Sequence, residues 1–140
     1  MMFSIKTIHS PVIIFEFTGQ QTLVEHSKSL LLWDNLLSQK SELIVLRIFT
    51  DNAALIHPKG AGKVTNRWLE SGAKQAIQQQ VLAMINIVPE QAYKKMQHMS
   101  VEKVFGVPGG IFKSKGEALH WLDNNVPLAQ NFIFSESIQS

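Results

Sequence analysis

The apolar positions of the chain follow two different spacings. Five short segments are rich in β-favouring apolar residues and are bounded by turn-forming residues, which predicts strands. The first two are separated by Ser10-Pro11, and this break predicts an N-terminal β-hairpin. Two others, LIVLRIF and VLAMINIV, are almost continuously apolar, as is typical of central strands covered on both faces. The five segments are 3–9, 12–17, 43–49, 81–88 and 111–112.

Four other segments carry apolar residues at the three- and four-residue spacing of a helix. Thr22 is followed three residues later by Glu25, the spacing of a capping box, and Ser114 and Glu117 repeat it. Pro89 suits the first position of a further helix. The expected helices cover about 22–37, 61–79, 89–99 and 115–124. Their inward positions are Leu23, Leu30, Trp33 and Leu37; Val64, Trp68 and Ile77; Ala92, Met96 and Met99; and Ala118, Leu119 and Leu122.

This order, ββαβαβαβα, predicts a single α/β domain over residues 1–126. Strands that are joined through a helix usually lie parallel in the sheet, and such crossovers are almost always right-handed. We therefore expect a mixed, mostly parallel sheet of four to five strands with about four helices and an antiparallel hairpin strand at one edge. Residues 127–140 form a C-terminal tail, and its Phe132, Ile133 and Phe134 would be buried either by a tail strand or by an intersubunit contact.

Composition narrows the functional classes. The chain has 140 residues, of which 45% are hydrophobic and 17% are charged, so it is globular and poor in charge. A charge-poor surface favours a homodimer. The formal net charge of +2 is too small to predict nucleic-acid binding. No cysteine is present, which excludes disulfides and thiolate chemistry. No leader sequence or membrane-spanning run is visible, so we expect a cytoplasmic protein without stable membrane insertion.

The longest irregular stretch, residues 50–62, is the expected functional surface. Its sequence HPKGAGKV approaches a phosphate-binding loop, but the first glycine of that motif is missing and Val64 follows Lys63 where Ser or Thr is required. A plain loop-to-helix turn is the simpler interpretation, and weak anion binding at the helix N-terminus is the alternative. The polar residues expected to contact a partner are Asp51, Asn52, His57, Lys59 and Lys63.

Signs of catalysis or metal binding are weak. The five histidines show no metal-ligand spacing, no serine occupies a nucleophile elbow, and the acidic residues are scattered over different elements. The sequence therefore predicts neither an enzyme, nor a metal site, nor a cofactor.

The tryptophans and methionines have two interpretations. Trp33, Trp68 and Trp121 fall on different predicted helices, where ordinary core packing is the simpler role. Alternatively, some of them line an apolar cavity between the helices and the sheet, in which flexible methionine side chains form part of the wall. The ligand-binding candidates on this interpretation are Trp68, Met84 and Met96.

Three segments resemble a known family: IFKSKGEALHWL at 111–122, VLAMINIVP at 81–89 and LIVLRIFTDN at 43–52. Together with the element order, they are similar to the STAS domain in its SpoIIAA-like (STAS/SEC14-like) branch. Signalling members carry a phosphorylated Ser or Thr after the central strand. Residues 51–63 contain neither, and only Thr50 and Thr65 flank this stretch. The resemblance therefore implies a scaffold that acts through binding without that switch.

Two functions follow as expectations. The first is a non-enzymatic binding protein with a regulatory role. Its partner would be another regulatory protein or a second copy of itself, contacted through the loop after the central strand. The alternative is a carrier or sensor of a small apolar, lipid-like ligand held between helices and sheet.

Overall fold

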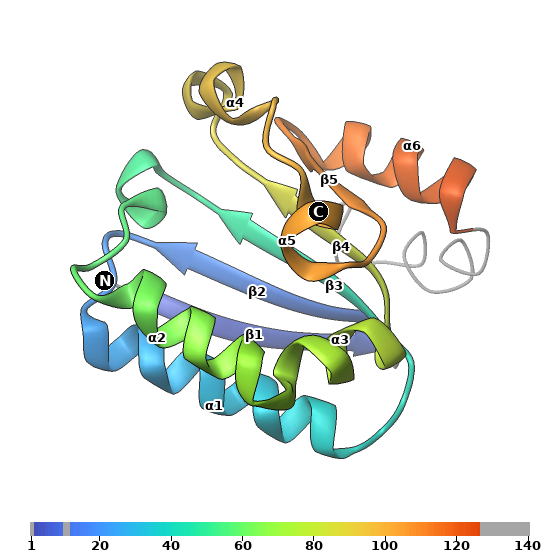
Figure 1. The fold of residues 1–140 in the computed structure, drawn as a ribbon. Coiled ribbons are helices and arrows are strands. Elements are labelled where there is room, and N and C mark those ends of the chain that lie inside the picture. The colour runs from blue at the N-terminus through green and yellow to red at the C-terminus, as the bar shows by residue number, and fades with distance from the viewer. Residues whose placement is uncertain (1, 10–11, 127–140) are drawn as a thin grey trace.

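Five strands form one sheet in the order β1-β2-β3-β4-β5 (Figure 1). The computed structural model describes residues 2–9 and 12–126, and the predicted tail at 127–140 lies outside them. Strands β2 to β5 pair in parallel, and β1 pairs antiparallel with β2 at the edge. The predicted α/β class, the mostly parallel pairing and the antiparallel hairpin strand at the edge are therefore confirmed. The strands are β1 (Met2–His9), β2 (Val12–Thr18), β3 (Leu43–Phe49), β4 (Val81–Ile87) and β5 (Gly109–Phe112).

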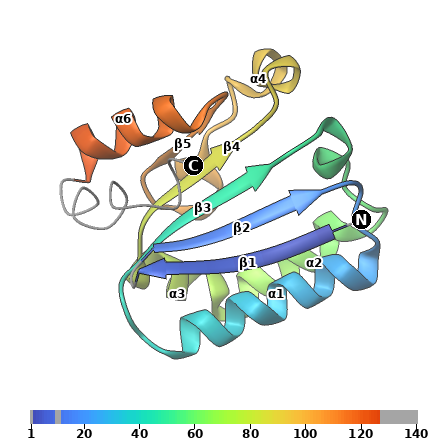
Figure 2. The same cartoon turned by 180° about the vertical axis from the view of Figure 1, so that it is seen from behind.

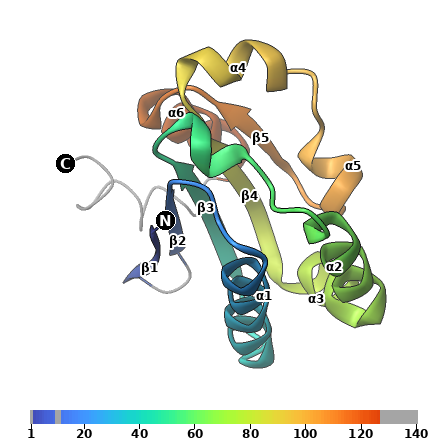
Figure 3. The same ribbon diagram turned by 90° about the vertical axis from the view of Figure 1, so that its left-hand side faces the viewer.

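The crossover helices lie on one face of the sheet and the last helix on the other. Seen from behind, β1 to β3 lie in front of α1 to α3 (Figure 2). The side view places α2, α3 and α5 on one side of the strands and α6 on the other (Figure 3). The helical elements are α1 (Leu23–Ser38), η1 (Asn52–Leu55), α2 (Ala61–Trp68), η2 (Leu69–Ala73), α3 (Lys74–Gln80), α4 (Glu90–Met96), α5 (Val101–Phe105) and α6 (Lys115–Asn125). No helix in the described ranges is long and apolar enough to cross a membrane.

Alternating strand residues build two cores. Val45 and Met84 face the crossover helices, whereas Ile44, Leu46 and Ile85 face α6. These side chains are almost completely buried on both faces, as expected for parallel strands with helices on both sides.

The helix caps confirm the local sequence signals. The Thr22 side chain accepts a hydrogen bond from the Glu25 amide, and the Glu25 side chain accepts one from the Thr22 amide. This reciprocal pair satisfies two amides that the first turn of α1 leaves without helical partners. Ser114 caps α6 through the Glu117 amide. Leu23 differs from its predicted inward position, because it is the first residue of α1 and lies partly exposed.

Two predicted helices are subdivided. The second contains a π-helical turn, η2, at Gly72, whose φ of 123° is outside the helical range and favours glycine. The third divides into α4 and α5, because Ser100 caps a new helix through the Lys103 amide. Pro89 is the N-cap of α4 and not its first helical residue, so the helix begins at Glu90, one residue later than predicted. The predicted inward position of Met99 is wrong: Met99 lies between the two helices and is largely exposed.

Candidate functional site

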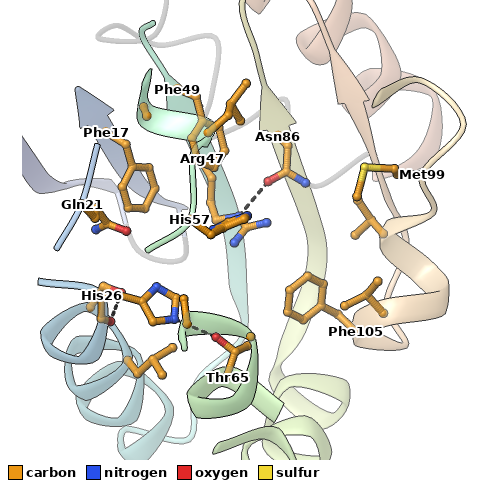
Figure 4. Close-up of a pocket in the computed structure, with 18 of the residues that line it drawn as sticks. Phe17, Gln21, His26, Arg47, Phe49, His57, Thr65, Asn86, Met99 and Phe105 are labelled. Carbon is orange, nitrogen blue, oxygen red and sulfur yellow. Dashed lines mark hydrogen bonds between the residues drawn. The ribbon is translucent and has the colours of Figure 1, made fainter. Parts of the chain in front are cut away.

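A pocket of about 430 Å³ opens at the carboxyl ends of the parallel strands, between α1 and α2 on one side and α5 on the other (Figure 4). Open α/β sheets commonly bind ligands at this end of their strands, and the volume falls within the range of small-molecule sites. The connection between β4 and β5 explains why the space stays open. Helix α4 buries none of its residues, and α5 has only five residues with which to cover the sheet.

Two polar residues form the floor of the pocket. Arg47 on β3 and Asn86 on β4 are partners in the parallel register and point to the same face. The Arg47 Nε donates a hydrogen bond of 2.7 Å to Asn86 Oδ1. The guanidinium also lies over the rings of Phe49 and Phe105, at 5.8 Å and 5.4 Å from their centres. Because these walls displace water, the pKa of Arg47 is lowered to about 10.

Two histidines approach the same space from different elements. His26 on α1 shares a hydrogen bond of 2.7 Å between its Nε2 and Thr65 Oγ1 on α2, whereas His57 lies in the loop after η1. Desolvation lowers the pKa of both, and the positive charge of Arg47 lowers them further. The site therefore favours neutral imidazoles beside one permanent cation.

Aromatic side chains form much of the remaining wall. Trp33 stacks on Phe15 in the core, with ring centres 5.4 Å apart, and meets Trp68 at 6.1 Å in a tilted arrangement. The Trp68 indole donates a 2.6 Å hydrogen bond to Asp34 Oδ1, which fixes its orientation. Phe17 and Phe49 stack at 4.9 Å. Such walls bury an apolar ligand body, and the few polar groups orient it.

The five predicted partner-contact residues do not converge on one point. Only His57 lines the pocket. The Asp51 carboxylate accepts hydrogen bonds from the Gly19 and Ala54 amides, so it holds the loop against the end of β2 and caps η1. Asn52 donates to the side chain of Gln91 at 3.0 Å. Lys59 and Lys63 are exposed. Their role in partner contact stays a prediction.

The predicted ligand-binding residues divide in a similar way. Trp68 and Met96 line the pocket, whereas Met84 lies below it, fully buried in the core that faces the crossover helices. Thr50 and Thr65 are each hydrogen-bonded: Thr50 Oγ1 donates to the Phe17 carbonyl at 3.0 Å, and Thr65 pairs with His26.

One sign of the polar floor is visible in the sequence. Arg47 is the only charged residue in LIVLRIF, and Asn86 is the only polar residue in VLAMINIV. In neighbouring parallel strands, two such exceptions on one face point to a common site. Residues 51–63 are predicted to form the contact surface because they lie in the longest irregular stretch of the chain. That criterion does not consider polar residues inside strands or helices, so it misses Arg47, Asn86 and His26 as candidates. Within the described residues, no group of three or more His, Cys, Asp or Glu side chains could hold a metal ion.

Comparison with known proteins identifies the fold. No protein-family model and no curated protein matches the chain. A crystal structure of an uncharacterized protein from the DUF3478 family with a SpoIIAA-like fold, from Shewanella loihica PV-4, is similar in structure. The match has a TM-score of 0.57 at 12% sequence identity and covers 86% of this chain and 92% of that chain. At this identity the similarity establishes a SpoIIAA-like fold, as the sequence predicted.

Proposed function

We propose that the protein is a non-enzymatic carrier or sensor that binds a small, largely apolar organic molecule in the pocket between α1, α2, α5 and the sheet. The observation that carries this proposal is the pocket itself. It is a preformed space of about 430 Å³ with aromatic walls and a few polar groups at its floor. The strand residues beneath it, such as Val45 and Met84, are fully buried, so the pocket lies directly above the hydrophobic core.

The position of the pocket also supports binding. The residues that line it come from strands β2 to β5, from helices α1, α2, α4 and α5, and from η1 and the loop that follows it, so a bound molecule would contact much of the crossover layer. Ligand binding would then stabilise the folded state by mass action.

Blocking the pocket tests this proposal. Val104 on α5 lines the pocket and is 49% exposed, so Val104→Trp can fill space without disrupting the core. Native mass spectrometry of freshly purified protein should show a bound mass that Val104→Trp lacks. A neutral polarity-sensitive dye, 1-aminoanthracene, should bind the natural sequence and not the variant.

Val24→Trp is the matched control, because Val24 on α1 is 64% exposed and lies outside the pocket. It should leave both signals unchanged. A clean apo mass together with no dye binding by the natural sequence would reject the proposal.

A second candidate function is contact with a second copy of the chain through the loop that follows β3. The observation that favours it is Ile56, an apolar side chain of this loop that is 53% exposed and lies three residues before the exposed Lys59 in the sequence. Sedimentation velocity should then show a dimer that Ile56→Ser weakens. Leu31→Ser changes an apolar residue of α1 that is 66% exposed, and an effect of that variant alone would place the contact on α1 instead. A monomer at all concentrations would exclude this candidate.

A further inference from the structure

The residues that line the pocket carry a positive charge and no negative charge. Among the residues that line it, Arg47 is the one permanent charge, and neither Asp nor Glu is present. His26 and His57 add no negative charge and are held towards their neutral forms. A single unbalanced positive charge therefore lies at the floor of a largely apolar space.

The hydrogen bonds of Arg47 leave its outer edge available. Its Nε is occupied by Asn86 Oδ1, and its planar face lies over Phe49 and Phe105. Within the described part of the chain, the two terminal Nη groups have no hydrogen-bond acceptor and no carboxylate partner. A charged group withdrawn from water is normally paired, because leaving it without a counter-ion is costly. Arg47 is half-buried, and this partial loss of contact with water lowers its pKa.

A second polar group at the pocket also lacks a partner. The Nε2 of Gln21 is buried without a hydrogen bond to any described residue. Buried donors are nearly always satisfied in folded proteins, so a donor left over at a cavity wall is consistent with an acceptor supplied from outside the chain. Figure 4 shows Gln21 and Arg47 on the walls of the same pocket.

The geometry of Arg47 selects the chemistry of the missing group. A guanidinium presents two parallel N–H donors that match the two oxygens of a carboxylate. Beyond Arg47 the walls are mainly apolar, and include Trp33 and Trp68. The complement of such a site has one anionic end and an apolar body.

We infer that the pocket binds an organic monoanion whose carboxylate pairs with the Nη edge of Arg47 and whose apolar body lies against Trp33, Trp68 and Phe105. This inference rests on the proposed ligand-binding function and names the class of ligand. The residue Asn86 acts as a positioning residue, because it fixes the guanidinium through Nε and turns its two Nη groups towards the cavity.

Matched acids and alcohols test the inference by isothermal titration calorimetry. Octanoate and 1-octanol share an aliphatic body, and 3-phenylpropanoate and 3-phenyl-1-propanol share an aromatic one. In each pair, the acid should bind the natural protein at least about tenfold more tightly than the alcohol, as expected for a charge-assisted bidentate contact. The better of the two acids then distinguishes an aliphatic from an aromatic ligand.

Arg47→Met should abolish the preference for the acids while the alcohols still bind. Arg47→Lys keeps the charge but loses the bidentate contact, so it should retain only part of the preference. Arg67→Met removes an exposed cation of α2 that does not line the pocket, and it should change neither affinity nor preference.

The outcomes separate this inference from the proposed function. Equal binding of acid and alcohol by the natural protein, or an unchanged preference in Arg47→Met, would overturn the anion site while the pocket remains a ligand site. Binding of none of the four compounds would overturn the inference and count against the proposed function as well. If Arg47→Met fails to fold, the acid–alcohol pairs on the natural protein and on Arg47→Lys still decide the result.

Discussion

The two faces of the sheet are built from the same parallel strands but differ at their carboxyl ends. On the face covered by α6, strand residues such as Ile44, Leu46 and Ile85 pack against Leu119 and Leu122, and these side chains are buried and apolar. This pattern continues to the ends of the strands, where Ile87 and Ile48 also join the cluster. That face is a filled core.

On the opposite face, the strands also begin with buried apolar residues, but they end with polar ones. Val45 and Met84 are fully buried beneath the crossover helices, but the next residues on the same face are Arg47 and Asn86. At this point the helix layer opens into the pocket. The difference indicates that one face serves mainly to stabilise the domain, whereas the end of the other is shaped for recognition.

The largest expected effect separates these two roles. Leu122 is 1% exposed against the sheet, so Leu122→Ala should lower the free energy of unfolding by about 2–5 kcal/mol through lost burial and a residual cavity. Ligand affinity should be unchanged wherever the variant is folded. Arg47→Met should change stability by no more than about 1 kcal/mol, since it removes a desolvated charge and leaves only the Asn86 acceptor without its donor.

Urea unfolding and calorimetry on both variants check this contrast. Comparable losses of stability, or a loss of affinity in folded Leu122→Ala, would contradict a division of roles between the faces.

The filled face is easier to predict from the sequence than the open one. Burial on both sides makes LIVLRIF and VLAMINIV almost continuously apolar, and Ser114 with Glu117 marks the start of α6, so local patterns suffice there. The pocket depends on where α5 begins and on which side chains meet across strands. Arg47 and Asn86 are 39 residues apart in the chain, and only the parallel register brings them together. Each segment by itself shows only one polar exception, and the pairing of the two exceptions depends on the strand register.

The loop residue Asp51 shows the same limit of prediction from local sequence patterns. Its place as a polar residue after the central strand predicts a partner contact, but its carboxylate is engaged within the chain. Asp51→Ala should lower the free energy of unfolding by about 1–2 kcal/mol, because it removes the cap of η1 and the contact with Gly19. Asn52→Ala, an exposed neighbour, is the control and should cost much less. Thermal unfolding of both measures this difference, and equal costs would reject the structural role of Asp51.

Two glycines of the pocket-side helices should respond in opposite directions. Gly72 has a φ of 123°, which an L-residue rarely adopts, so Gly72→Ala should destabilise the protein by about 1 kcal/mol or more. Gly62 lies in the first turn of α2, and a methyl group added there would point into open space, so Gly62→Ala should stabilise by up to about 1 kcal/mol. Chemical denaturation distinguishes the signs. A stabilising Gly72→Ala would show that α2 and α3 can join into one regular helix.

The smallest effect concerns pH on the pocket side. Because desolvation and Arg47 lower the pKa of His26 and His57 in the folded state, the unfolded chain binds protons more readily, and stability should decline as the pH falls through about 6.5. His26→Gln and His57→Gln should each flatten this decline between pH 7.5 and 5.5, and saturating octanoate should reduce it, since a bound anion beside Arg47 favours the protonated imidazoles. Urea unfolding at several pH values tests the prediction. A profile that is flat in the natural protein, or as steep in both variants, would show that the histidines do not sense the charge at the pocket floor.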